Sequence, residues 1–256
     1  MEENQSPEVE KASRPASSLG SRLMDILVAP GEVFDSIKAG PPFTANWLVP
    51  ILIICLVGIA SVFVSFSQPA VIQQMRDQQT KRFDRMVETG KMTAAQAEAS
   101  QAQLERFMGP GFLKAAGSVA AIVGSFGWLF FLALVLWLLG TRLFKGQFSF
   151  QQAVEATALT GMIGVVGAII TTLLVVATGN LMMTPGPALL IREFDPANKI
   201  HLALAAINVI TIWYIAVLAL GLAKLSGAAY VQAAAWLFIP WLVIKLGIVF
   251  SGLGHS

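Results

Sequence analysis

The chain has 256 residues, of which 55% are hydrophobic and only 12% are charged, and its formal net charge is +2. Soluble domains carry about 25% charged residues. This composition and the mean hydropathy of +0.69 therefore exclude a water-soluble globule and a disordered chain. The small net charge, with no Lys/Arg-rich block among aromatic residues, argues against a nucleic-acid partner.

The N-terminal part of the chain is the first polar region. Residues 1–17 are rich in Glu, Ser and Pro, which predicts a disordered tail. Residues 18–46 predict an amphipathic juxtamembrane segment, in which 18–38 forms two short helices separated at Ala29-Pro30-Gly31. Two placements remain open for these helices: the membrane surface, or the end of a helix bundle.

Five long apolar runs predict an all-α fold, a polytopic membrane helical bundle with five transmembrane helices. About 20 helical residues at ~1.5 Å each are needed to cross ~30 Å of hydrocarbon. The predicted spans are about 47–66, 118–140, 156–177, 201–223 and 229–250, within a membrane domain of residues 47–252. Between the third and fourth spans, Gly179-Asn180 and Pro185-Gly186-Pro187 predict an ordered loop in place of a sixth span.

Residues 67–114 form the one sizeable polar segment between spans. Apolar residues at helical spacing and a capping-box pattern from Thr93 to Gln96 predict an extramembrane helical hairpin. We expect its apolar stripe to pack on the bundle or on a partner chain. The stripe consists of Val71, Ile72, Met75, Phe83, Met86 and Val87.

The connectors before the third and fifth spans resemble each other. Ser149 and Ser226 each follow a short basic connector, and both are predicted helix N-caps. Two spans separate the connectors, so we expect both on the same side of the membrane. The basic residues outside the spans divide almost evenly between the two sides, so the positive-inside rule does not set the orientation.

Polar side chains within predicted spans are candidate functional groups because they are costly in hydrocarbon. Glu155 is a candidate proton or cation site, or an interfacial carboxylate near Arg142 or Lys145. Lys245 is a candidate site, or a lysine that reaches back to the interface. Asn208 could form a hydrogen bond with Lys245, either as a structural clamp or as part of a site.

Small residues at helical spacing predict close contacts between helices. The predicted packing residues are Ala120 and Gly124 in the second span, and Gly161, Gly164 and Gly167 in the third. Pro240 lies in the middle of the fifth span and is predicted to kink it, because proline frees the carbonyl of Trp236.

No motif in the sequence points to an enzyme, a cofactor or a metal. Gly-x-Ser-x-Gly, His-Glu-x-x-His, P-loop and Rossmann glycine patterns are all missing. The two histidines, His201 and His255, are far apart and have no cysteine cluster near them, and the one cysteine, Cys55, lies in an apolar run. We therefore expect a protein without catalytic, cofactor-binding or metal-binding residues.

Several short motifs occur in an order and spacing that resemble bacterial Yip-domain membrane proteins. The opening motifs are Leu27-Val-Ala-Pro-Gly-Glu-Val-Phe34, Pro41-Pro42 and Trp47-Leu-Val-Pro50. The start of the third span carries Phe148-Ser-Phe-Gln-Gln-Ala153. The last hairpin carries Thr211-Ile-Trp213, Leu218-Ala-Leu-Gly-Leu-Ala223, Ser226, Trp236 and Lys245-Leu-Gly247. The resemblance covers about 20–252.

The resemblance implies a five-span protein of the bacterial inner (plasma) membrane with a cytoplasmic N-terminus and no catalytic residue. Eukaryotic Yip proteins are similar in layout and bind Rab-type small GTPases, but the 67–114 loop resembles the bacterial form, so GTPase binding is not carried over. Our leading hypothesis is a non-enzymatic membrane scaffold that recruits lipid or protein partners, a second copy of the chain included. The alternative is a subunit of a small-molecule or ion transporter or channel.

Overall fold

The computed structural model describes residues 18–105, 107–191 and 198–251. Within these ranges the chain is all-α and contains no strand. The predicted disordered tail, residues 1–17, lies outside the described residues.

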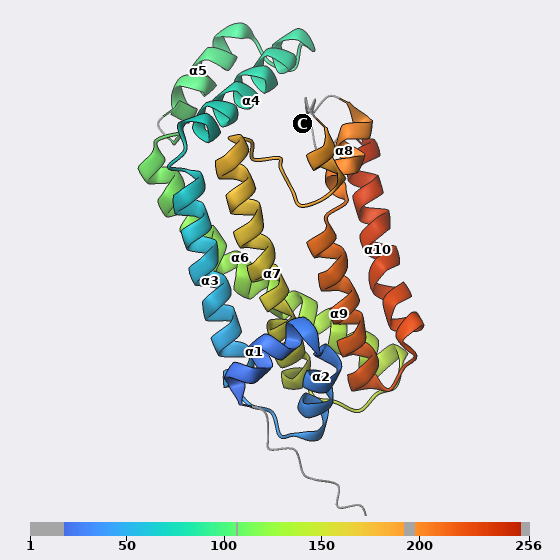
Figure 1. The fold of residues 1–256 in the computed structure, drawn as a ribbon. Helices are drawn as coiled ribbons and strands as arrows, with labels where there is room; N and C mark the ends of the chain where they lie inside the picture. Colours follow the sequence, from blue (N-terminus) through green and yellow to red (C-terminus); the bar gives the residue numbers. More distant parts are fainter. Residues whose placement is uncertain (1–17, 106, 192–197, 252–256) are drawn as a thin grey trace, which may run out of the picture.

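Five helices are long and apolar enough to cross a membrane, which confirms the predicted number. They are α3 (Ala45–Ser65), α6 (Pro110–Leu138), α7 (Phe150–Thr178), α9 (Val209–Ser226) and α10 (Tyr230–Ser251). The π-helical turn η1 (Leu139–Leu143) extends α6. Helix α7 packs against α3, α6 and α9, and α10 packs against α9 (Figure 1). The buried part of α7 thus forms much of the core.

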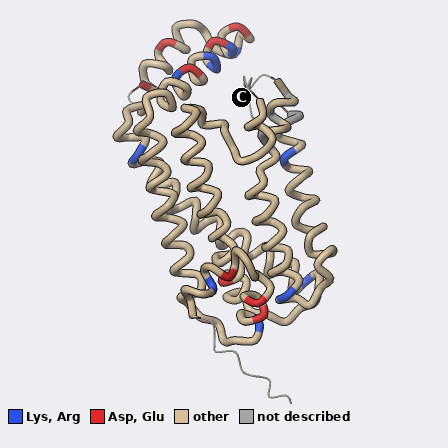
Figure 2. Tube along the Cα trace, viewed as in Figure 1, with Lys and Arg blue, Asp and Glu red and all other residues tan. Residues whose placement is uncertain are grey.

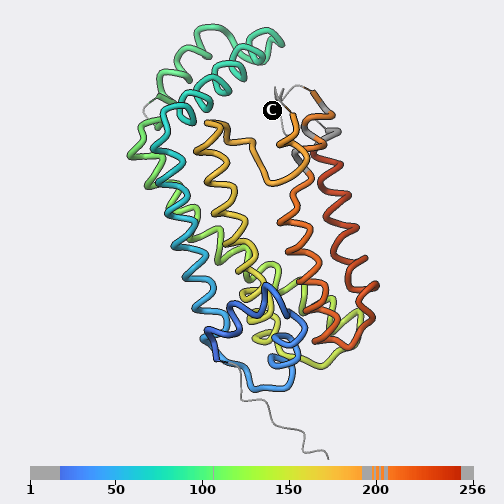
Figure 3. Tube along the Cα trace, viewed as in Figure 1, coloured from blue at the N-terminus to red at the C-terminus, as the bar shows by residue number. Residues whose placement is uncertain are grey.

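The spans run in alternate directions, so the connections fall at two ends of the bundle. Figure 3 shows the 18–46 segment at one end and the end of α10 at the other. Lys, Arg, Asp and Glu also gather at these two ends, and the middle of the bundle is almost free of them (Figure 2). This distribution is typical of a membrane-spanning bundle, because charged side chains are costly in hydrocarbon.

The predicted N-terminal helices are present as α1 (Leu19–Val28) and α2 (Pro30–Ala39). Ser18 caps α1 by accepting the N–H of Ser21, and Pro30 stands in the first turn of α2. Ile26 and Phe34 are fully buried. Of the two placements left open by the sequence, the structure has the helices packed on the end of the bundle, with α1 against α7 and α2 against α9.

The predicted hairpin in 67–114 is present as α4 (Pro69–Glu88) and α5 (Ala94–Glu105). The capping box is present: the backbone N–H of Gln96 donates to Thr93 Oγ1, and that of Thr93 donates to Gln96 Oε1. In the apolar stripe only Val71 is buried, and α4 and α5 pack on each other. The other stripe residues are partly buried, and the hairpin projects from the bundle (Figure 1). Packing of the stripe on a partner chain stays a prediction.

The predicted fourth span is interrupted. Helix α8 (Lys199–Ala206) stops before Ile207, and the span α9 begins at Val209. The loop that follows α7, which includes the 3-10 helix η2 (Pro187–Leu190), explains the break. The N–H of Val209 donates to the carbonyl of Pro185 at 3.0 Å, and a Cβ on Gly186 would lie 2.0 Å from the Ile207 oxygen. The loop thus crosses directly over the break.

The two predicted N-cap serines differ. Ser149 is the N-cap of α7, as predicted, and the structure adds a complete capping box with Gln152. Ser226 is the last residue of α9, where its hydroxyl donates to the Leu222 carbonyl, so its predicted N-cap role is wrong. The two connectors do meet at one end of the bundle, because a Cβ on Gly146 would lie 2.4 Å from Ser226 Cα.

Candidate functional site

The segment from α1 to the start of α3 is fastened to the bundle at several points. A Cβ on Gly221 would lie 3.0 Å from two ring atoms of Phe34, so α2 approaches α9 closely. Lys224 Nζ donates to Asp35 at 2.7 Å, and Lys38 Nζ donates to the carbonyl of Lys224 at 2.7 Å. These contacts fix α2 on α9.

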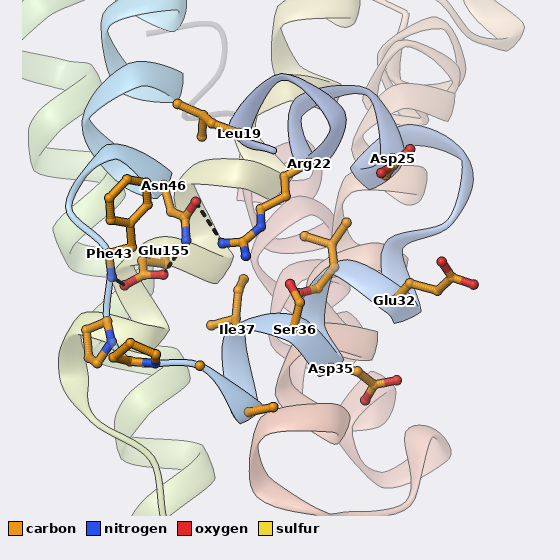
Figure 4. A pocket seen from close by; sticks show the side chains of 15 residues that line it. Leu19, Arg22, Asp25, Glu32, Asp35, Ser36, Ile37, Phe43, Asn46 and Glu155 are labelled. Carbon is orange, nitrogen blue, oxygen red and sulfur yellow. Dashed lines mark hydrogen bonds between the residues drawn. The ribbon is translucent and has the colours of Figure 1, made fainter. Parts of the chain in front are cut away.

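Beneath α1 and α2 lies a chain of three polar side chains, Arg22, Asn46 and Glu155, which we call the polar junction (Figure 4). Glu155 is 1% exposed and comes from the second turn of α7. Its Oε2 accepts the Asn46 side-chain amide at 2.7 Å, and its Oε1 accepts the backbone N–H of Phe43 at 2.7 Å. Arg22 donates to Asn46 Oδ1 at 3.1 Å.

The polar junction is electrostatically complementary. A buried carboxylate is tolerated only when hydrogen bonds replace its water. Asn46 donates to Glu155 through its nitrogen and accepts from Arg22 through its oxygen, so it bridges the negative and positive ends of the chain. The amide polarity is assigned from these two partners. The junction thus joins α1, α3 and α7, and Glu155 has these partners in place of Arg142 or Lys145.

A cavity of about 690 Å³ opens beside the polar junction. Its lining includes the junction and three acidic residues of α1 and α2, Asp25, Glu32 and Asp35. In Figure 4 the side chains of Asp25, Glu32 and Asp35 point away from Glu155. No group of three or more His, Cys, Asp or Glu residues that could hold a metal ion occurs in the described part of the chain.

A second cavity, of about 770 Å³, lies at the opposite end of the bundle. It is formed where α3 ends and where α4 and α6 begin, and its charged lining residues are Arg76 and Lys114. We call it the basic cavity. The sequence did not indicate that these two residues lie close together, because most of the hairpin separates them along the chain.

Asn208 and Lys245 are not brought together. Asn208 is the N-cap of α9, where its Oδ1 accepts the N–H groups of Ile210 and Thr211 at 2.9 and 3.3 Å. Lys245 is exposed, and within the described ranges no hydrogen bond links it to Asn208. The predicted clamp between them is therefore wrong, and Asn208 has a local capping role instead.

Two of the five predicted small packing residues lie at close helix contacts. A Cβ on Gly161 would lie 2.6 Å from Ile54 Cδ1, and one on Gly167 would lie 2.6 Å from Ile210 Cγ2. Gly164 faces open space between them. Ala120 and Gly124 are also exposed, and Gly124 has nothing within 4 Å of its Cβ position, so these three are not packing positions within the chain.

The close approach of α6 to α3 occurs one turn from the predicted pair. A Cβ on Gly117 would lie 2.8 Å from Val62 Cγ1. Helix α10 continues through Pro240 without a break. The kink predicted there stays a prediction.

Sequence reasoning selected Glu155 but missed its partners. Asn46 and Phe43 lie 109 and 112 positions away along the chain. The available signal was the position of Asn46, a polar side chain in the first turn of a span and close to Pro41-Pro42.

One of three comparisons with known proteins identifies a family. No curated protein and no solved structure matches the chain. A family model, the Yip1 domain, matches residues 24–251. The match begins within α1 and ends in α10, so it includes the polar junction except for Arg22, the hairpin and all five spans. The chain belongs to the Yip1 domain family.

Proposed function

We propose that this Yip1-domain membrane protein is a non-enzymatic scaffold that recruits partners through its extramembrane helices. The observation that carries the proposal is the α4–α5 hairpin. Its two helices pack mainly on each other, and most of their charged side chains face outward. A helical hairpin held at the bundle end but projecting from it presents long surfaces that the chain itself leaves uncovered.

The base of the hairpin is fixed, which suits a recruiting surface. Gln74 Nε2 donates to Asn180 Oδ1, and the N–H of Leu181 donates to Gln74 Oε1, both at 2.9 Å. The hairpin is thereby tied to the loop after α7. A partner bound to a fixed hairpin would be held at a defined place on the membrane. Binding to a fixed hairpin also costs less conformational entropy than binding to a mobile one.

The bundle interior gives no support to the transporter or channel alternative. Transporters place broken helices and polar groups near the middle of the membrane. The buried polar side chains of the described residues are Asn46, Glu155, Thr157 and Thr160. All four lie within the first three turns of α3 or α7. The two threonine hydroxyls donate to carbonyls of their own helix.

The resemblance of the 67–114 loop to bacterial Yip-domain proteins supports the inner (plasma) membrane of a bacterium as the location, with a cytoplasmic N-terminus. In that orientation the hairpin meets partners on the outer side of this membrane. The absence of catalytic motifs from the sequence supports a role without chemistry.

Site-specific photocrosslinking in native membranes tests the proposal. A photoreactive amino acid replaces Gln78 on α4 or Ala95 on α5, both exposed. The matched control replaces Val123, an exposed residue of the candidate span α6. We expect a discrete protein adduct from the hairpin positions and only lipid adducts from the control. An adduct of twice the chain's mass identifies a second copy as the partner.

A hairpin that yields no protein adduct at either position contradicts the proposal. So does an adduct that forms equally from Val123, because it would show random collision in the membrane. Replacing 69–105 by a short linker checks the same point, since it should abolish co-purification of the crosslinked partner.

A further inference from the structure

The basic cavity lies where the hairpin meets the membrane-spanning helices. It measures about 770 Å³. Phe66 to Pro69 contribute the end of α3 and the start of α4, and Pro110 and Lys114 contribute the start of α6. The described residues that line it include two cations and no acidic residue.

Neither of these two cations takes part in an ion pair within the described residues. Arg76 is exposed on α4. The ammonium of Lys114 lies 5.7 Å from the ring centroid of Phe63, a cation–π distance. Two positive charges from different helices thus line one cavity without an ion-pair partner among the described residues.

Polar donors and helix ends add to this positive character. Gln73 also lines the cavity, and its side-chain amide can donate hydrogen bonds. Helices α4 and α6 both begin at the cavity, each with proline in its first turn, so the positive ends of two helix dipoles lie nearby. The ligand that satisfies such a set of groups is an oxyanion with several acceptor atoms.

The position of the cavity decides the source of that anion. Phe63 and Phe112, both 49% exposed, lie at the end of α3 and the start of α6. Helix α3 has 21 residues, a length of about 30 Å that matches the thickness of the hydrocarbon region, so its end lies at the level of the lipid headgroups. A basic cavity at this level meets phospholipid phosphates at far higher concentration than any soluble phosphate, because the membrane surface is built from them.

We infer that the basic cavity binds the phosphate of an anionic phospholipid headgroup through Arg76 and Lys114. The inference rests on the proposed function and supplies its lipid partner. The acyl chains of the bound lipid lie along α3 and α6, beside Phe63 and Phe112. Binding of this lipid fixes the base of the hairpin relative to the membrane.

Native mass spectrometry of the full chain in detergent tests the inference. The protein is titrated with phosphatidylglycerol, which is anionic, and with phosphatidylcholine, which carries the same phosphate without net charge. The test variant R76Q/K114Q is compared with K81Q/R82Q, which removes the same charge from exposed positions of α4 that do not line the cavity. R76K/K114R keeps both charges.

We expect the wild-type chain to retain phosphatidylglycerol in preference to phosphatidylcholine. Because each cation near an anionic lipid contributes on the order of fivefold to binding, R76Q/K114Q should lower this retention by about tenfold or more. K81Q/R82Q and R76K/K114R should stay within about twofold of the wild type. R76Q alone gives the same direction if the double variant does not fold, because Arg76 is exposed.

Three outcomes overturn the inference. The first is equal retention of phosphatidylglycerol by wild type and R76Q/K114Q, and the second is equal retention of the two lipids. The third is displacement of the lipid by millimolar inorganic phosphate, which would identify a site for a soluble anion. Crosslinking from Gln78, repeated in R76Q/K114Q, separates the two proposals: a partner adduct that persists without lipid binding leaves the scaffold role intact.

Discussion

The side-chain amide of Asn46 and the carboxylate of Glu155 are 2.7 Å apart, although 109 positions separate them in the chain. This hydrogen bond joins the first turn of α3 to the second turn of α7. Together with the Phe43 N–H, it supplies both oxygens of a buried carboxylate with donors. Glu155 is therefore one of the points that hold the α1–α2 segment on the bundle, beside the contacts of α2 with α9.

The first prediction concerns Glu155. E155A leaves the Phe43 N–H and the Asn46 amide without their acceptor, and each unsatisfied buried group costs about 1–3 kcal/mol. E155Q should be intermediate, because glutamine keeps one acceptor oxygen but turns an NH2 group toward a donor. Thermal unfolding in detergent measures both variants. The control is E98A on the exposed helix α5, which should change stability by less than about 0.5 kcal/mol.

An unfolding temperature of E155A equal to that of E98A would show that the polar junction adds no stability. The alternative role of Glu155, as a proton or cation site, would then be the one to test.

The second prediction concerns the contact between Phe34 and Gly221. G221A introduces a Cβ 3.0 Å from two ring atoms of Phe34, which is tighter than ordinary van der Waals contact. Overpacking of this kind costs about 1–3 kcal/mol, and α2 should move away from α9. Cleavage by trypsin after Lys38 should become faster than in the wild type. The control is G164A, whose Cβ meets nothing within 4 Å.

If trypsin cleaves G221A and G164A at the wild-type rate, α2 is not held by its contact with Gly221. G221V extends the series, because a larger side chain should increase the rate further.

The third prediction concerns Gln74, which ties the hairpin to the loop after α7. Q74A removes hydrogen bonds to Asn180 and Leu181, each worth about 1 kcal/mol. We expect a broader distribution of distances between spin labels placed at Lys91 and Val176 in a C55A background. Q78A, a change at an exposed position of the same helix, should leave the distribution as it is. A narrow distribution in Q74A would show that another contact fixes the hairpin.

The fourth prediction concerns the sides of the membrane. Five spans place the end of η1 and the tip of the hairpin on opposite sides. In a C55A background, a membrane-impermeant maleimide should react with K91C in intact cells and with R142C only after the membrane is opened. Labelling of both positions in intact cells would contradict the count of spans. Labelling of R142C, and not of K91C, in intact cells would agree with five spans but would place the N-terminus outside the cell.

Patterns that act over a few residues were sufficient to predict the local structure. The apolar runs gave five spans, and the helix breaks at Pro30 and near Gly179 occur where proline and glycine stand. The capping boxes at Thr93 and Ser149 are local in the same sense, because each needs only a residue three positions away.

Features that depend on contacts between distant segments were predicted poorly. Asn208 stands in an apolar run that favours one continuous helix, and the break there comes from the loop at Pro185 and Gly186. Small residues at helical spacing do not show which helix they meet, so Gly124 was predicted to pack and Gly117 was not. The partners of Glu155 depend on the topology of the whole bundle, and so does the meeting of Arg76 and Lys114 at one cavity.

Helix α7 extends between two contacts that belong to different aqueous compartments. Near its first turns Glu155 holds the α1–α2 segment, and just beyond its last turn Asn180 accepts a hydrogen bond from Gln74 of the hairpin. Its 29 residues form a rod about 43 Å long. A shift of α7 along its axis would alter the contacts at both water-facing surfaces at the same time. A soluble molecule in either compartment can bind at only one of these surfaces.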